Sequence, residues 1–279
     1  MKIGAHVSIA GGIQNAPLNA AKQGCECFQF FSRSPRGGKY VDFTAKEIEE
    51  FKANCRKNKL TDYYIHTPYF INLASLDSRI KHGSINACRQ ELARGSLLGA
   101  QGIMTHLGSA GERSEKEAIA ETVKSIDRIL ASYVGSTKFL IEISAGSGKI
   151  LGDTFEEIAE ILKSIKSKNV GVCFDTAHAF ASGYDLSSKT AVYKTIADFD
   201  KLIGLEKLMV IHTNDSKVAL GSRVDRHEHI GQGKIGIKGF RALMNHPKLR
   251  DIDFIIETPK ANDLSDKENM KILKSLIKE

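Results

Sequence analysis

Metal-ligand residues recur directly after short apolar runs in this chain. The runs read YYIH, GIMTH, KFLIE, GVCFD, LMVIH and DFIIE, and each ends in a histidine or a carboxylate. A short apolar run of this kind is typical of a strand that is buried on both faces. One histidine after a strand is more often structural, but six such endings predict separate strands that bring metal ligands to one place. The six residues are His66, His106, Glu142, Asp175, His212 and Glu257.

Helical patterns separate these strands in regular alternation. Two further apolar runs, KIGAHVS and CECFQFF, precede the six, so we expect eight strands with a helix after each. The longest helix is expected from Ser78 to Leu98, with Gly99 as its stop. Four helices are expected to begin at a capping box, in which Ser or Thr is followed three residues later by Glu. The pairs are Thr44 with Glu47, Ser114 with Glu117, Thr154 with Glu157, and Ser265 with Glu268.

The alternation predicts an α/β fold with a parallel sheet. Eight strand–helix units fit a (β/α)8 TIM barrel, whereas a doubly wound open sheet has the same periodicity. The ligand pattern favours the barrel, because the carboxyl ends of all its strands meet at one mouth. Distant strands of an open sheet could not surround one metal cluster. No linker or shift in composition divides the chain, so we expect one domain over residues 1–279 with a metal site at the carboxyl ends of the strands.

Three more metal-ligand residues lie outside the apolar runs. His178 comes three residues after the aspartate of GVCFD, on an expected first helical turn. Asp225 and His227 lie two apart in a loop of more than twenty residues, where an extended segment would project both side chains the same way. Nine His, Asp and Glu residues are too many for one tetrahedral ion and suit a multinuclear hydrolytic site. Supporting roles are expected for His6, Glu228 and His229.

Composition indicates a polyanionic partner and a reducing compartment. The formal net charge is +7 and the pI is about 9.0. Because bound metal would neutralise several acidic residues, the remaining surface is more basic still, which favours nucleic acid. Five cysteines do not make a full set of pairs and predict reduced thiols. With no signal peptide and no apolar stretch of about twenty residues, we expect a cytoplasmic protein that makes no membrane contact.

Longer segments of the chain resemble those of a known family. GVCFDTAHAFASGYDL, HTNDSK and GSRVDRHEHIGQGKIG are similar to the signature segments of the endonuclease IV family of zinc-dependent apurinic/apyrimidinic endonucleases. GAHVSIAGG and the IET of the last strand also fit, so the resemblance runs from residue 3 to about residue 259. It implies a (β/α)8 barrel with three zinc ions at its mouth. By motif position, one zinc would be held by His66, His106 and Glu142, a second by Glu142, Asp175, His212 and Glu257, and the third by His178, Asp225 and His227.

The resemblance also implies a reaction. The family cleaves the DNA backbone on the 5′ side of an abasic site, leaving a 3′-hydroxyl and a 5′-deoxyribose phosphate, and it trims blocked 3′ ends. We expect hydrolysis by a zinc-activated water, with Glu142 as the catalytic residue that orients the water. The expected partner is double-stranded DNA with abasic sites or blocked 3′ ends, and the expected state is a monomer.

Further residues are assigned to DNA contact by the same resemblance. Family members insert side chains at the lesion and flip out the abasic nucleotide. Tyr69 and Phe70, in the loop after YYIH, occupy the corresponding place, and Arg36 in the loop after CECFQFF is a third candidate. Core packing is the alternative for the two aromatic residues. Phosphate contact or close backbone approach is expected at Lys217, Arg223, Gly11, Gly12, Gly231 and Gly233.

The chain departs from the family pattern beside its proposed bridging carboxylate. Ile143 and Ser144 follow Glu142, where Asn-Thr is expected. An isoleucine side chain makes none of the hydrogen bonds of an amide, so metal affinity or rate is expected to depend on what replaces them.

Two other functions are compatible with parts of the pattern. A divalent-metal sugar isomerase or epimerase of the xylose-isomerase-like barrel class would have more carboxylates and fewer ions in its site. A non-enzymatic DNA-damage binder would not need so many ligands around an open site. The histidine-rich set and the basic pI favour the endonuclease.

Overall fold

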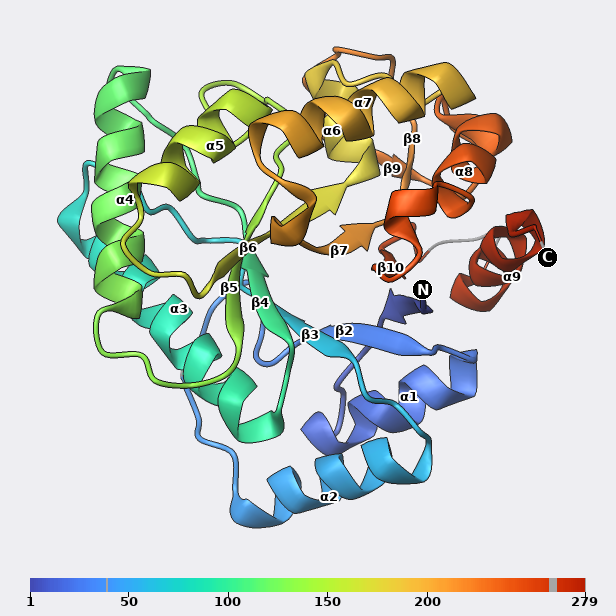
Figure 1. The fold of residues 1–279 in the computed structure, drawn as a ribbon. Helices are drawn as coiled ribbons and strands as arrows, with labels where there is room; N and C mark the ends of the chain where they lie inside the picture. Colours follow the sequence, from blue (N-terminus) through green and yellow to red (C-terminus); the bar gives the residue numbers. More distant parts are fainter. Residues whose placement is uncertain (39, 261–264, 279) are drawn as a thin grey trace.

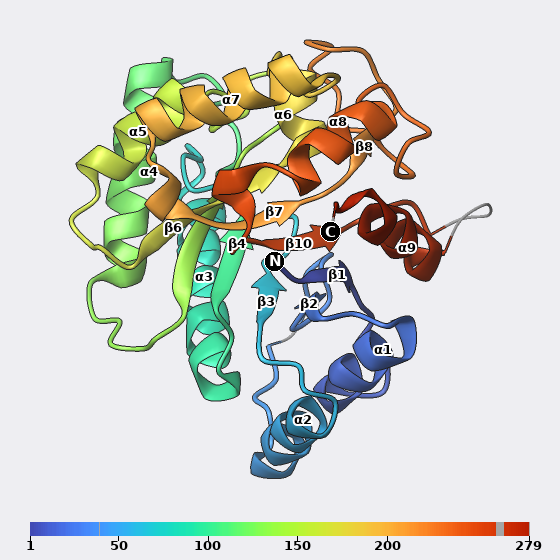
Figure 2. The same cartoon turned by 45° about the vertical axis from the view of Figure 1, so that its right-hand side comes forward.

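Eight parallel strands form a closed barrel at the centre of the molecule (Figure 1). The computed structural model describes residues 1–38, 40–260 and 265–278. The strands follow chain order around the barrel, and the last pairs with the first through Ile3 with Phe254 and Ala5 with Ile256 (Figure 2). The predicted barrel is therefore confirmed over the open sheet. The strands are β1 (Ile3–His6), β2 (Cys27–Phe31), β3 (Tyr63–His66), β4 (Gly102–Thr105), β5 (Lys138–Glu142), β6 (Val170–Asp175), β7 (Leu208–His212) and β10 (Asp253–Ile256).

Helices surround the barrel on the outside (Figure 1). They are α1 (Ala16–Gln23), α2 (Ala45–Lys57), α3 (Ser78–Leu98), α4 (Glu115–Leu130), α5 (Phe155–Ser164), α6 (Thr176–Ser182), α7 (Lys189–Leu202), α8 (Gly236–Met244) and α9 (Asp266–Leu276). Short 3-10 turns occur at Ile13–Asn15, Leu205–Lys207 and Pro247–Leu249. Helix α3 has the predicted bounds, and Gly99 ends it with a left-handed φ of 90°. Helix α6 is an addition to the predicted alternation, because β6 is followed by two helices rather than one.

Three of the four predicted capping boxes are present, at the starts of α2, α4 and α9. The fourth prediction is half right. Thr154 accepts a hydrogen bond from the backbone N–H of Glu157, as predicted, but the Glu157 carboxylate accepts from the backbone N–H of Gly152 instead of closing the box. The glutamate therefore ties helix α5 to the loop that precedes it.

The barrel interior is built in layers. Seven strands each contribute one buried side chain to an interior cluster: Cys27, Tyr64, Met104, Leu140, Cys173, Val210 and Ile255. Because side chains alternate along a strand, the residues two positions further on face the same interior one layer closer to the mouth. Those residues are Gln29, His66, His106, Glu142, Asp175, His212 and Glu257. A mainly apolar floor thus supports a polar layer at the carboxyl ends of the strands.

The long loop after β7 is ordered by a carboxylate. Within it, the short strands β8 (Asp215–Ser216) and β9 (His227–Glu228) pair antiparallel. The buried Asp215 carboxylate accepts hydrogen bonds from the backbone N–H groups of Gly231, Gly233, Ile235 and Gly236. The loop therefore has a fixed fold that returns residues 225–227 to the barrel mouth.

All five cysteines are buried free thiols. Among the residues that the structure describes, no helix combines the length and apolar character needed to span a membrane.

Candidate metal centre

The barrel mouth gathers the nine predicted ligands. Eight of them form three overlapping groups, within each of which the donor atoms lie no more than 4.8 Å apart. The ninth, Asp225, has its Oδ1 atom 3.3 Å from Nε2 of His178. The groups are His66, His106 and Glu142; Glu142, Asp175, His212 and Glu257; and Asp175, His178 and His227.

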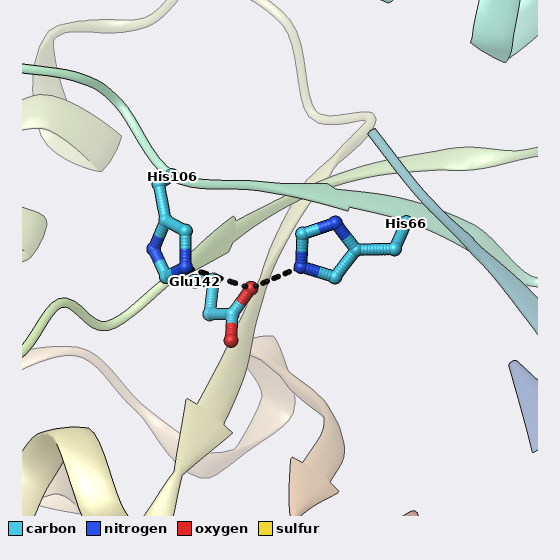
Figure 3. A group of neighbouring side chains, drawn as sticks. All are labelled: His66, His106 and Glu142. Atoms are coloured by element: carbon cyan, nitrogen blue, oxygen red, sulfur yellow. Dashed lines mark hydrogen bonds and ion pairs between the residues drawn. The ribbon is translucent and has the colours of Figure 1, made fainter. Parts of the chain in front are cut away.

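Glu142 lies between two of these groups and is fully buried. One carboxylate oxygen, Oε2, is 3.1 Å from Nε2 of His66 and 3.7 Å from Nε2 of His106. Figure 3 shows the two rings directed at this one oxygen. The other oxygen, Oε1, is 2.9 Å from Nδ1 of His212. Because each oxygen faces a different group, the carboxylate has the arrangement of a bridge between two cations.

The three residues predicted to hold the third zinc, His178, Asp225 and His227, allow a direct test of whether the donor atoms fit a metal. Nε2 of His178, Nε2 of His227 and Oδ1 of Asp225 are separated by 3.3, 3.3 and 3.5 Å. A tetrahedron whose corners lie ~2.0–2.1 Å from its centre has edges of about 3.3–3.4 Å, which is the ligand spacing of a zinc site. Three donor atoms at these spacings form one face of such a site, so the donor set fits zinc.

Main-chain carbonyls fix the orientation of three of the histidines. Nδ1 of His66 is 2.7 Å from the carbonyl of Thr67, Nδ1 of His178 is 3.0 Å from that of Ile143, and Nδ1 of His227 is 3.1 Å from that of Glu257. A carbonyl only accepts, so each Nδ1 donates and each Nε2 is the nitrogen left to face a metal. Ile143 therefore orients a ligand through its backbone, while its side chain packs in the core.

Electrostatics favour cations at this mouth. Burial disfavours the charged form of His178, but Asp175, Asp225 and Glu142 outweigh it and raise its pKa to about 10. Burial acts against the charged form of Asp225 too, yet the hydrogen bond and positive charge of His178 hold the pKa of that carboxyl at about 2. The proton that His178 gains thus balances carboxylate charge that a bound metal cation would otherwise balance.

Two supporting residues were missed by sequence reasoning. The Asn214 amide donates to Oδ2 of Asp175 at 2.7 Å and accepts from the backbone N–H of Glu257 at 2.7 Å. Gln29 contacts both His212 and Glu257. The signal for Gln29 was its spacing, since it follows Cys27 by two residues as each strand-end ligand follows a floor residue.

The residues predicted to support the site have different surroundings. Nδ1 of His6 is 3.2 Å from Oε1 of Glu257, so His6 lies behind a predicted ligand. His229 is buried and contacts the Asn269 amide, and Glu228 accepts a hydrogen bond from the backbone of His229. Of these three, His6 touches the predicted ligand set directly.

The predicted lesion-contacting residues lie on adjoining loops. Tyr69 is 68% exposed and Phe70 is 41% exposed, which excludes core packing for both side chains. The Tyr69 ring lies 6.3 Å from the His66 ring, and its backbone N–H donates to the carbonyl of Pro35. Arg36 is exposed next to that carbonyl. The loop after β3 thus exposes both aromatic rings, with the Tyr69 ring beside the candidate metal centre.

The other predicted DNA contacts are spread over two loops. Lys217 and Arg223 are exposed in the loop after β7, and the Arg223 guanidinium is 3.6 Å from Asp153. Gly11 and Gly12 have positive φ angles of 84° and 123° in the loop after β1. Gly231 and Gly233 donate their amides to Asp215, and a side chain on Gly233 would collide with the carbonyl of Ser216. Close packing within the loop is thus one reason for a glycine at position 233.

The closed barrel and the histidine–carboxylate cluster at its mouth are the features of TIM barrels with a metal centre. A family model for xylose isomerase-like TIM barrels matches residues 18–276. "Probable endonuclease 4" from Halothermothrix orenii is 39% identical over 261 residues, covering 93% of this chain and 94% of that protein. The crystal structure of endonuclease IV from Thermus thermophilus has a TM-score of 0.87 and 32% identity, covering 99% of this chain and 98% of that one. The chain belongs to the endonuclease IV family. A D-tagatose 3-epimerase-like protein has a TM-score of 0.75 with 20% identity over 99% of this chain and 97% of that one, which shows a shared fold alone.

Proposed function

We propose that this protein is a zinc-dependent repair endonuclease that hydrolyses the phosphodiester bond on the 5′ side of abasic sites in double-stranded DNA. The products would be a 3′-hydroxyl and a 5′-deoxyribose phosphate, and the same site would trim blocked 3′ ends. Family membership supports a phosphodiester hydrolase acting on DNA. The observation that carries the proposal is the cluster of three donor groups, two of which share Glu142, with spacings that suit zinc.

The ligand groups would hold three zinc ions per chain. His66 and His106 would hold one with Glu142, and His178, Asp225 and His227 would hold another. The third would lie among Glu142, Asp175, His212 and Glu257. Bound zinc would supply an activated water and offset the charge of the phosphate oxygens.

Glu142 is the proposed catalytic residue. Its two oxygens face different donor groups, and burial excludes bulk water from both. A carboxylate in that place would accept a hydrogen bond from the attacking water and so direct it at phosphorus. No covalent intermediate with the protein is needed for this hydrolysis.

Substrate choice would come from the exposed loops around the mouth. Tyr69 and Phe70 would enter the duplex where the base is missing, because the cost of unstacking is lowest there. Arg36 would be the third residue at the lesion, and Lys217 and Arg223 would contact phosphates, in keeping with the net charge of +7. A monomer would suffice, since all nine proposed ligands come from one chain.

A duplex oligonucleotide with one tetrahydrofuran abasic analogue tests the proposal, because this analogue blocks lyase chemistry. The zinc-loaded protein should cut it on the 5′ side and leave a 3′ end that a polymerase extends. The same duplex without the lesion should stay intact. No incision by fully metallated protein would overturn the proposal, and epimerisation of a ketose would favour the sugar-enzyme alternative.

A further inference from the structure

The polar layer at the barrel mouth contains one neutral amide. Six of its side chains are the proposed strand-end ligands, and β1 and β2 add His6 and Gln29. Gln29 is fully buried and pairs in register with His6. Its Nε2 atom is 2.6 Å from Oε1 of Glu257 and 2.9 Å from Nδ1 of His6, and its Oε1 atom is 2.6 Å from Nε2 of His212.

These contacts determine the direction of each hydrogen bond. The ionised Glu257 carboxylate only accepts, so the amide nitrogen of Gln29 must face it. The amide oxygen must then face His212. An amide oxygen also only accepts, so Nε2 of His212 carries the proton and donates.

With Nε2 of His212 bound to Gln29, Nδ1 is the nitrogen left to face the carboxylates. Nδ1 lies 2.9 Å from Glu142, 3.3 Å from Glu257 and 3.8 Å from Asp175, within the second donor group. His212 therefore faces the group through Nδ1, whereas His66, His178 and His227 direct Nε2 at theirs. For those three the orienting acceptor is a main-chain carbonyl, but for His212 it is a side chain.

We propose that Gln29 is a positioning residue that makes Nδ1 of His212 the metal-facing nitrogen and holds Glu257 beside it. The inference rests on the proposed metal-dependent function, because it concerns two of the proposed ligands. Outer partners of this kind typically change metal affinity by about 10–100-fold when they are removed. A substitution at Gln29 can remove its hydrogen bonds, whereas no substitution removes the three main-chain carbonyls.

The test compares Gln29→Met, Gln29→Glu and a matched control. Methionine keeps the length of the side chain and removes both hydrogen bonds. Glutamate keeps an acceptor for His212 and loses the donor to Glu257. Tyr64→Phe is the control, because it removes a partly buried hydrogen bond to Asp253 at the other end of the barrel interior. Thermal unfolding of each protein would show that the variants are folded.

Two readouts do not depend on activity. Zinc affinity is measured by competition with a chelator, and the protonated ring nitrogen of His212 is identified from histidine 15N spectra of the zinc-loaded proteins. We expect Gln29→Met to weaken zinc binding about 10–100-fold and to remove the hydrogen-bonded Nε2–H signal. Gln29→Glu should retain that signal, and Tyr64→Phe should match the unmodified protein in both readouts.

The outcomes separate this inference from the proposed function. Unchanged zinc affinity in folded Gln29→Met, or an unmodified protein whose His212 is protonated at Nδ1, would overturn the role of Gln29. If Gln29→Met did not fold, loss of the Nε2–H signal in Gln29→Glu would overturn it. If the unmodified protein bound zinc without cutting abasic DNA, and Gln29→Met weakened that binding, the inference would stand and the endonuclease proposal would fail.

Discussion

The Nε2 atoms of His178 and His227 lie 3.3 Å apart and face each other. Each ring already donates its Nδ1 proton to a main-chain carbonyl, so in neutral rings two lone pairs point into the same space. A shared cation would stabilise that arrangement, and Asp225 offers a third donor atom beside the two rings. The loop after β7 thus completes a binding site that the barrel strands begin.

We predict that His227→Ala protein binds two zinc ions instead of three. The substitution removes one of the three donors His178, Asp225 and His227 and leaves the other two predicted ligand groups intact. Native mass spectrometry and elemental analysis would count the ions. His82→Ala, an exposed position on α3, is the control and should keep three. Three tightly held ions in His227→Ala would mean that the histidine is not a ligand.

Glu142→Gln should abolish incision while DNA binding survives. The amide keeps the size of the side chain but has one acceptor in place of two, so it cannot serve both donor groups. We expect the single-turnover rate on a tetrahydrofuran duplex to fall by at least about 10²-fold. Fluorescence anisotropy of the same duplex should show an affinity close to that of the unmodified protein. Incision at the original rate would remove Glu142 from its proposed role.

The barrel and the convergence of the strand-end ligands could both be predicted from the sequence, for the same reason. Charged or ionisable side chains are rare at the ends of strands buried on both faces, so their recurrence carried information about one shared place. The spacing of Asp225 and His227 similarly predicted that both would point at one site, and their donor atoms lie 3.5 Å apart.

The features that could not be predicted from the sequence depend on contacts that no local pattern encodes. The fold of the loop after β7 rests on four backbone amides that meet the Asp215 carboxylate, and no local pattern encodes that meeting. Gln29 was overlooked because an amide is not a usual zinc ligand, although its spacing from Cys27 matched the rule. The Thr154 box failed to close because Gly152 offered Glu157 a different donor.

Tyr69→Ala and Phe70→Ala should reduce discrimination for abasic sites more than general DNA affinity. Both side chains are exposed and the Tyr69 ring lies beside His66, where inserting into an intact base stack would cost more than filling the gap left by a missing base. The ratio of dissociation constants for lesion and undamaged duplexes measures this. Val134→Ala, which is 99% exposed at a different surface, should leave the ratio unchanged. An equal loss of affinity for both duplexes would argue against insertion.

Glu157→Gln should stabilise the protein at pH 8 and have little effect at pH 4. Burial, opposed by the Gly152 N–H and assisted by the charge of Asp153, raises the pKa of Glu157 to about 7. Since this folded-state pKa lies above the ordinary value of 4.5, the stability that Glu157 contributes is complete below about pH 4.5 and is lost as the pH rises through about 7. The gain from the amide at pH 8 should be about 1–2 kcal/mol, because nearby solvent screens part of the charge.

Urea unfolding of both proteins across this pH range measures the effect of Glu157→Gln. Glu160→Gln is the matched control, because Glu160 is exposed on the same helix and should leave the pH profile unchanged. Parallel profiles for Glu157→Gln and the unmodified protein would contradict the proposed burial of a protonated carboxyl.

The most direct test of the central claim is a zinc titration of the metal-free protein in which bound zinc and incision of a tetrahydrofuran duplex are measured at each step. A three-zinc endonuclease predicts that incision rises with zinc, saturates at three equivalents per chain and produces only 3′-hydroxyl ends on the 5′ side of the lesion. Saturation at one equivalent, or no incision when all three groups are filled, would contradict the account.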